Sequence, residues 1–320
     1  MDPEEIRKAE LHCHLIGVID ASLLNKLPHF GSDPLLDPTE ILPPEKVNGQ
    51  DGFLAWLESL GPYRNASWTA FLPIVQAHLN NLRKQNVVYA EIMISPIMFS
   101  GVLDAAIVEL RQFVEETQRL SQDAPIIRYL FVIPRSATVE MIAKDTQFFL
   151  AAKQERLIVG AAVVGLSHEQ DLRQLFPMLS TLKDHGLGIE IHTGEHTEAA
   201  EVQEVLNSGL ADRLGHAISG FSAPDIIDAM ARASIHVEFC PTSNLKTGVI
   251  ASANDLPIRQ ALDNNIAFSI NTDDPGAFGC SLTGEFSLIA EAHELDASVL
   301  HQIYRDTIRA AFDPNLELPG

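Results

Sequence analysis

Short apolar segments alternate with longer amphipathic segments along almost the whole chain. The short segments are compact, as expected for parallel strands that are buried on both faces. They predict eight strands, at residues 9–14, 87–94, 126–133, 158–164, 188–192, 214–216, 235–239 and 267–271. The longer segments carry apolar residues on one helical face, and they predict helices at residues 103–120, 139–153, 169–184, 199–207, 223–232 and 257–264.

The number of strand–helix alternations indicates the architecture. Eight of them predict an α/β protein with a single (β/α)8 TIM barrel, whereas fewer would indicate a doubly wound sheet. The length agrees with this prediction, because 320 residues with 46% hydrophobic content suffice for one barrel domain over residues 1–320.

One region interrupts the alternation. Residues 27–63 are rich in Pro, Gly, Asn and Asp, and they carry Phe53, Trp56 and Leu57 at helical spacing. Because a long insertion after a barrel strand lies over the catalytic face, we interpret residues 27–86 as a helical lid insertion followed by the first barrel helix. The alternative is a surface excursion whose apolar side chains only pack on the barrel.

Charge and cysteine content limit the classes of binding partner and the cellular compartment that we expect. A net charge of -21 repels phosphate backbones and anionic lipids, so we expect a small-molecule substrate, no nucleic acid and no membrane surface. The three cysteines are widely spaced and form no CxxC motif, which argues against disulfides or a thiolate zinc site and fits a reducing compartment. The first residues lack an apolar signal core, and no apolar segment is long enough to span a bilayer. We therefore expect a cytoplasmic protein.

Polar residues gather where the predicted strands end. His12 and His14 close the first strand, and their side chains point the same way because strand side chains alternate between faces. In a barrel that direction is the lumen, at the mouth where catalysis takes place. His192 closes the fifth strand, and Glu195 follows in a turn that Gly194 permits. A single buried histidine would more simply be a core residue.

The sixth and eighth strands add three more polar residues. His216 ends the sixth strand, and Asp273 and Asp274 follow the eighth. Adjacent carboxylates are costly to bury unless a metal or hydrogen-bond donors neutralise them. The alternative for the two aspartates is a helix N-cap before Pro275.

Three imidazoles and a carboxylate at one rim predict a mononuclear metal centre. Nitrogen and oxygen ligands without thiolates favour one Zn²⁺, with Fe²⁺, Co²⁺ and Mn²⁺ as alternatives. Such a metal lowers the pKa of a bound water toward ~7 and makes hydroxide available at neutral pH. The chain has neither a GxxxxGK[ST] phosphate loop nor a GxSxG nucleophile motif.

Five motifs, in this order, resemble the adenosine deaminase family of metal-dependent amidohydrolases. They are AELHCHLIG (9–17), IHTGE (191–195), LGHA (214–217), EFCPTSN (238–244) and NTDDP (271–275). The resemblance implies a (β/α)8 barrel with zinc bound by His12, His14, His192 and Asp273. It also implies three catalytic roles. Glu195 would deliver a proton to a purine ring nitrogen, His216 would orient the attacking hydroxide, and Asp274 would hydrogen-bond the imidazole part of the purine.

The activity implied by this resemblance is hydrolysis of a cyclic amidine C–N bond. Adenosine, adenine or a modified derivative would become the 6-oxo purine, and ammonia would leave. Protonation makes the amine-bearing carbon electrophilic, and the metal supplies the nucleophile at the same rim. Two alternatives stay open: a zinc-dependent deaminase or hydrolase of another heterocycle, such as a pterin, and a catalytically inert homologue that binds purines.

Two departures from the family pattern concern the substrate. The family carries an acidic or amide residue after HxHL, and Ile16 stands there in this chain. After the fourth strand the sequence GLSHE (165–169) replaces an Asp-containing motif, which makes Ser167 and His168 candidate substrate contacts. We expect further contacts from His14, Asp274, Phe53 and Trp56. Because an apolar side chain rejects a polar group, we expect an adenine derivative that is apolar near Ile16, such as a modified nucleoside or an N6-substituted purine.

Overall fold

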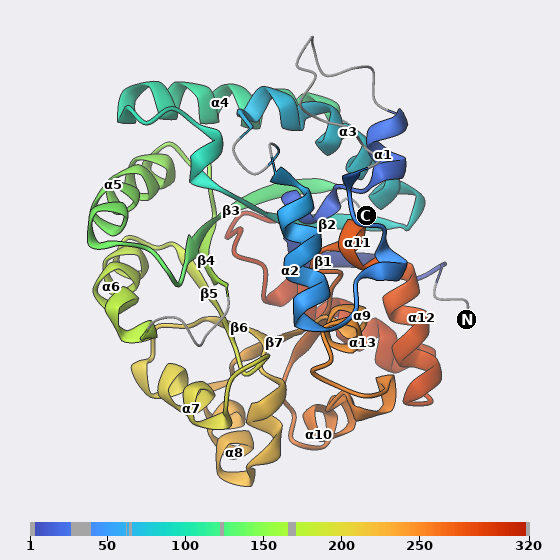
Figure 1. Ribbon diagram of the computed structural model, residues 1–320. Coiled ribbons are helices and arrows are strands. Elements are labelled where there is room, and N and C mark those ends of the chain that lie inside the picture. Colours follow the sequence, from blue (N-terminus) through green and yellow to red (C-terminus); the bar gives the residue numbers. More distant parts are fainter. Residues whose placement is uncertain are drawn as a thin grey trace.

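The strands of the computed structural model form one parallel sheet in the order β1-β2-β3-β4-β5-β6-β7-β8, with helices around it (Figure 1). The structure describes residues 4–26, 40–61, 63, 66–121, 125–165 and 171–317. The strands are β1 Lys8–His14, β2 Val87–Ile94, β3 Ile126–Pro134, β4 Gly160–Val164, β5 Gly188–Thr193, β6 Arg213–His216, β7 His236–Phe239 and β8 Phe268–Ile270. The predicted (β/α)8 barrel is confirmed.

The first and last strands meet through the residues that follow β8. The backbone N–H of Asp273 donates to the carbonyl of His12 at 2.9 Å, and the N–H of His14 donates to the carbonyl of Asp273 at 2.9 Å. Thr272, the residue before Asp273, also contacts β1, because its hydroxyl donates to the buried Glu10 carboxylate at 2.9 Å. These bonds bring the two ends of the sheet together and place Asp273 beside His12 and His14.

Helices alternate with the strands, and none in the described residues is long and apolar enough to cross a bilayer. The α-helices are α1 Ala21–Lys26, α2 Gly49–Ser59, α3 Trp68–Lys84, α4 Leu103–Leu120, α5 Val139–Gln154, α6 Phe176–Asp184, α7 Ala199–Ser208, α8 Pro224–Ala233, α9 Pro241–Lys246, α10 Ile258–Asp263, α11 Pro275–Phe278, α12 Leu282–Ala292 and α13 Ala297–Arg309. Helix α2, within the predicted insertion, lies in front of the strands in Figure 1.

One predicted helix has a different start. The amphipathic pattern predicted a helix over residues 169–184, but α6 begins at Phe176. A 3-10 helix at Leu172–Leu175 precedes it, and Pro177 lies in the first turn of α6. Proline is favoured there because its missing N–H and fixed φ suit a helix start and not a helix interior.

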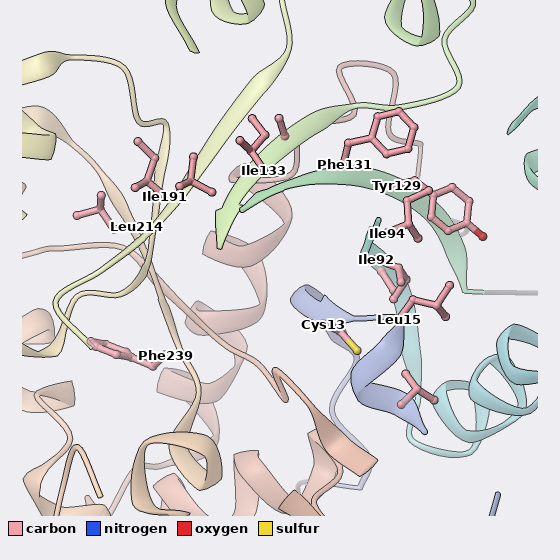
Figure 2. Packing of buried hydrophobic residues seen from close by; sticks show 14 of the residues in the cluster. Cys13, Leu15, Ile92, Ile94, Tyr129, Phe131, Ile133, Ile191, Leu214 and Phe239 are labelled. Atoms are coloured by element: carbon pink, nitrogen blue, oxygen red, sulfur yellow. The ribbon is translucent and has the colours of Figure 1, made fainter. Parts of the chain in front are cut away.

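Alternate strand residues build two separate layers of packing. Figure 2 shows the layer between the sheet and the helices, with Phe131, Ile191 and Leu214 among its labelled side chains. The intervening residues, such as Glu190 and His192, face the lumen because side chains alternate along a strand. Hydrophobic packing therefore holds the strands from outside, and the lumen is left free to carry polar chemistry.

The lumen is closed, at the end opposite the catalytic mouth, by Phe312. A Cβ placed on Gly188 would lie 2.2 Å from the Phe312 ring, and one on Gly160 would lie 2.6 Å from it. The guanidinium of Arg213 lies 3.5 Å from the ring centroid, a cation–π contact. The backbone N–H of Phe312 donates to the Glu91 carboxylate at 2.6 Å. The two glycines are therefore needed for space.

We predict that Gly188→Ala lowers the stability of the barrel through overpacking, by about 1–3 kcal/mol. The loss should shrink in a Phe312→Ala background, because the ring that the new methyl group meets is gone. Urea unfolding of the four proteins of this cycle measures both effects. Gly101→Ala is the matched control, since a Cβ there comes no closer than 3.7 Å to its nearest neighbour. Equal losses in both backgrounds would contradict the packing argument.

Candidate active site

Three histidines and one aspartate converge at the catalytic mouth of the barrel. His12 and His14 come from β1, His192 comes from β5, and Asp273 follows β8. Asp273 Oδ1 lies 3.5 Å from His12 Nε2 and 3.4 Å from His14 Nε2. His14 Nε2 and His192 Nε2 are 3.3 Å apart. The four ligand atoms of this group all lie within 4.8 Å of one another.

These separations fit a tetrahedral metal site. Ligand atoms about 2.0–2.1 Å from a Zn²⁺ ion lie roughly 3.3–3.4 Å from one another when the geometry is tetrahedral. Three of the distances between ligand atoms of this cluster lie between 3.3 and 3.5 Å and match that spacing. The residues that the sequence nominated as ligands are therefore brought together with the spacing that a metal requires.

Two buried glutamates fix the orientation of the histidine rings. Glu238 Oε2 lies 2.8 Å from Nδ1 of His12, and Glu190 Oε2 lies 3.1 Å from Nδ1 of His192. When Nδ1 donates to a carboxylate, the lone pair of the neutral ring is on Nε2, which faces the cluster in both cases. Burial lowers the pKa of His14 and of His192 to about 3, which keeps these two rings neutral and able to bind a cation.

The Glu238 contact continues into a buried ionic network. Arg213 forms ion pairs with both neighbouring acids: its Nε lies 2.6 Å from Glu238, and its Nη2 lies 2.7 Å from Glu91. The Tyr89 hydroxyl also donates to Glu91, at 2.6 Å. Burial raises the pKa of Glu238, but the charge of Arg213 and the hydrogen bond with His12 outweigh it, and the net pKa falls below the usual value. Arg213 thus keeps Glu238 ionised while Glu238 holds His12.

The space around these groups depends on a glycine in β6. A Cβ on Gly215 would lie 2.3 Å from Glu190 Oε1, 3.0 Å from His12 Cε1 and 3.1 Å from His192 Nδ1. A larger residue would therefore displace both histidine rings and the carboxylate between them. This explains why the strand before His216 carries a glycine at a lumen-facing position.

A left-handed backbone conformation orients the side chains of Asp273 and His216. Asp273 has φ 61° and His216 has φ 60°, which is uncommon for residues other than glycine. Such conformations persist where surrounding contacts enforce them, and they cluster at functional sites. Ser243 supplies one such contact, because its hydroxyl donates to Asp273 Oδ2 at 2.6 Å.

Glu195 and His216 lie beside the cluster. His216 Nε2 is 3.7 Å from Glu195 Oε2, and His216 Nδ1 is 3.1 Å from the Asn244 side-chain amide. Desolvation raises the pKa of Glu195 to about 8, with the charge of Asp273 as the second cause. Although 21% of its side chain is accessible, that surface faces the cavity and not the open exterior. Glu195 therefore carries a proton at neutral pH, as a general acid requires.

Asp274 is buried at the N-cap position of α11, and its side chain makes no capping hydrogen bond. The alternative that the Asp273–Asp274 pair serves as a helix N-cap is therefore correct only for the position of Asp274. Its side chain does not cap the helix. Burial, followed by the charge of Asp273, raises the pKa of Asp274 well above its usual value. Asp274 lines the same cavity as His14, His192 and Asp273 of the cluster.

The cavity over this site has a volume of about 960 Å³. His14, Ile16, Asp274 and Phe53 line it, as do Glu195 and His216. Trp56 does not line it. Its side chain is fully buried and stacks behind Phe53 at 5.8 Å between ring centroids. Ser167 and His168 lie outside the described residues.

A thiol also lies near the cluster. His12, His216, Cys240 and Asp273 form a second group with ligand atoms within 4.8 Å. Burial, together with the charges of Asp273 and Glu10, raises the pKa of the Cys240 thiol well above its usual value. A neutral thiol is a weak ligand, because the thiolate is the form that binds metals. The nitrogen and oxygen donors are therefore the stronger set.

The sequence analysis missed Glu190 and Glu238, although Glu238 opens the EFCPTSN motif and Glu190 comes directly before IHTGE. Glu190 precedes His192 by two residues, so the strand period places both on the lumen face. A glutamate two positions before a candidate ligand, within an apolar strand, was the feature of the sequence that could have identified it. The Arg213 network had no comparable signal, because it joins side chains from β2, β6 and β7.

A parallel barrel with histidines and an aspartate at the carboxyl ends of β1, β5 and β8 defines a class of metal-dependent hydrolases. Within this class, the chain belongs to the adenosine deaminase family, whose profile matches residues 7–317. It is a hydrolytic deaminase of that family.

Curated relatives align over nearly the whole chain. An adenine deaminase from Sinorhizobium fredii is 24% identical over 313 residues, which cover 96% of this chain and 94% of that protein. An aminodeoxyfutalosine deaminase from Streptomyces avermitilis is 27% identical over 319 residues, which cover 95% of this chain and 86% of that protein.

Solved structures share the fold. An N6-mAMP deaminase from Arabidopsis superposes with a TM-score of 0.84 at 22% identity, covering 98% of this chain and 95% of that one. An amidohydrolase from Burkholderia ambifaria with bound Zn superposes with a TM-score of 0.81 at 17% identity, covering 98% and 87%. At these identities the likeness concerns the fold alone.

We predict that Glu238→Gln weakens binding of a divalent metal by roughly 10–100-fold, because His12 loses the carboxylate that orients its ring. Competition between the protein and a chelating dye for Zn²⁺ measures the change. Glu155→Gln removes a carboxylate from an exposed ion pair with Arg111 and is the matched control. Unchanged Zn²⁺ affinity in a folded Glu238→Gln protein would contradict the orienting role.

Proposed function

We propose that this protein is a zinc-dependent deaminase that converts an adenine-type purine to the 6-oxo purine and ammonia. The observation that carries the proposal is the convergence of His12, His14, His192 and Asp273 at a cavity that Glu195 also lines. Hydrolytic deamination needs a nucleophile and a proton donor at the same carbon–nitrogen bond. The relatives named as adenine and aminodeoxyfutalosine deaminases support a purine substrate.

Zinc is the metal that the donor set favours. Three imidazole nitrogens and one carboxylate oxygen suit Zn²⁺, and the ligand spacing suits its tetrahedral geometry. The Burkholderia ambifaria structure, which contains Zn on the same fold, supports the choice. When bound, the metal supplies hydroxide at neutral pH by lowering the pKa of water.

The residues of the chain perform the remaining steps. Glu195 holds a proton near pH 7 and donates it to a purine ring nitrogen, which makes the amine-bearing carbon more electrophilic. Burial lowers the pKa of His216 well below its usual value, so its ring is neutral and can orient the nucleophile by a hydrogen bond. Asp274, protonated in its buried position, donates a hydrogen bond to the imidazole part of the purine.

The substrate is proposed to be adenosine, adenine or a modified derivative, with an apolar group near Ile16. Ile16 lines the cavity next to His14 and offers no hydrogen bond. A polar substituent placed against it would lose its hydration without gaining a partner. His14, Phe53 and Asp274 are proposed as further substrate contacts, since each lines the same cavity.

We also propose that the chain acts as one barrel domain with α2 as its lid. Phe53, Leu54 and Leu57 of α2 line the cavity, so this helix covers the site from the side of the insertion. Phe53 also stacks on Phe278 of α11, with 5.5 Å between ring centroids. This contact joins the lid to the segment that follows Asp274. Closure over the substrate would exclude water from the reaction.

We predict that Glu195→Gln lowers kcat for ammonia release from adenine or adenosine by at least ~100-fold, the usual worth of a positioned general acid. The amide cannot deliver a proton, while the metal ligands are left intact. Zinc content, measured in parallel, should stay at that of the parent protein. Glu198→Gln, at the exposed N-cap position of α7, is the matched control. A Glu195→Gln protein with parental kcat would remove the proposed mechanism.

The same carboxyl group predicts the pH dependence. Its pKa is raised from 4.5 to about 8, so it is protonated below that pH and loses its proton above it. A cation bound nearby favours the charged form and lowers this pKa. We therefore expect kcat to fall with rising pH, with an apparent pKa well above 4.5 and no higher than about 8. A kcat that stays constant up to pH 9.5 would contradict the role of Glu195.

A further inference from the structure

The cavity extends well beyond the metal cluster in one direction. We use the name apolar arm for the part lined by β2, β3, β4, the segment after β2, and α5. Its apolar lining residues are Met93, Ile97, Met98, Phe99, Val132, Pro134, Met141, Phe148 and Val164. A volume of about 960 Å³ lies at the upper end of the range of roughly 300–1,000 Å³ for pockets that hold drug-sized ligands. A bare purine would leave much of this space unfilled.

The two sides of the barrel lumen differ in chemistry. The proposed reacting residues come from β1, β5 and the segments after β5 and β8, together with His216 of β6. On the other side, Met93 of β2, Leu130 of β3 and Ala162 of β4 form a buried apolar cluster, and Val132 and Val164 pack against it. A purine held at the metal cluster therefore has a polar wall on one side and an apolar wall on the other.

The apolar arm continues to the surface. Ile97 is 58% exposed and Met141 is 42% exposed, and both line the cavity. The other large hydrophobic side chains that are exposed in the described residues also fall between these two positions in sequence: Val102, Leu103, Val108 and Val139. Ile97 and Met141 are thus exposed apolar side chains that also line the cavity, and exposed apolar surface of this kind often marks a binding site.

Charge excludes a phosphate group from this arm. Apart from the residues of the proposed reacting centre, the charged side chains among the described lining residues are Glu58, Lys144 and Asp145. One cation between two acids makes a poor phosphate site, because phosphate recognition relies on clusters of Arg or Lys or on helix N-termini. The net charge of -21 further disfavours an anionic substrate.

We propose that the apolar arm is a binding site for a bulky, uncharged group on the purine substrate. This inference rests on the proposed deamination, which places the amine-bearing carbon at the metal and the imidazole part of the purine at Asp274. The N9 position then points away from the metal, toward the open part of the cavity. The preferred substrates are aminopurines that carry an alkyl or aryl group on the N9 side, directly or through a sugar. Free adenine and nucleoside phosphates are poor substrates.

A kinetic panel tests the substrate class. We expect kcat/KM for 9-benzyladenine to exceed that for adenine at least tenfold, since a filled apolar pocket discriminates by about 10–200-fold per group. We expect kcat/KM for AMP to fall at least tenfold below that for adenosine. A protein that prefers adenine to 9-benzyladenine, or AMP to adenosine, would overturn the inference.

A pair of variants on α5 tests the location. Met141→Asp places a charge in the arm, and Val139→Asp places the same charge two residues earlier at a position that is 84% exposed and does not line the cavity. Met141→Asp should lower the ratio of kcat/KM for 9-benzyladenine over adenine at least fivefold, and Val139→Asp should leave it at the parental value. Equal ratios in both variants would contradict the location.

Two outcomes separate this inference from the function on which it rests. If no aminopurine releases ammonia with the zinc-loaded protein, the proposed deamination fails. If adenine is deaminated but 9-benzyladenine is not preferred, only the apolar arm fails.

The exposed apolar surface could instead be a contact between two copies of the chain, and sedimentation velocity tests this alternative. A dimeric parent protein that both aspartate variants convert to monomers would assign that surface to contact between subunits, and it would overturn the substrate site.

Discussion

An excess of buried carboxyl groups in the barrel lumen is the constraint on which the rest of the site depends. Glu91, Glu190, Glu238 and Asp273 are all buried, and Arg213 forms ion pairs with Glu91 and Glu238. Burying a charge is costly unless it is paired or neutralised. The structure uses each available solution: Arg213 pairs with two glutamates, protons are retained on others, and imidazoles surround Asp273.

This constraint connects the metal centre to the acid chemistry. Burial, and after it the charge of Asp273, raises the pKa of Glu195 and of Asp274, and the same charge favours a cation between the histidines and Asp273. A binding site for positive charge and two protonated acids therefore arise from one arrangement. The apolar wall on the opposite side of the lumen makes the effect stronger, because low polarity increases the cost of leaving a carboxylate ionised.

Much of the fold could be predicted because each strand is a compact apolar segment and lumen residues follow a period of two. His12 and His14 were placed correctly by that period alone, and eight alternations were enough to indicate a closed barrel. The start of α6 was wrong because an amphipathic pattern does not distinguish a 3-10 turn from the helix that follows it. Trp56 shows a similar limit. Helical spacing identified the helix but could not tell which of its apolar side chains faces the cavity.

The contacts of residues 310–313 have a consequence for biosynthesis. Arg213, which keeps Glu238 ionised below His12, donates to the carbonyl of Ala310 and lies over the Phe312 ring. Asp313 pairs with Arg128 on β3. Support for a ligand in the first strand thus comes from the last described part of the chain. During synthesis the support of His12 is therefore completed only after residues 310–313 have left the exit tunnel and packed against Arg213, so the ligands on β1 stay incompletely supported until α13 has been made.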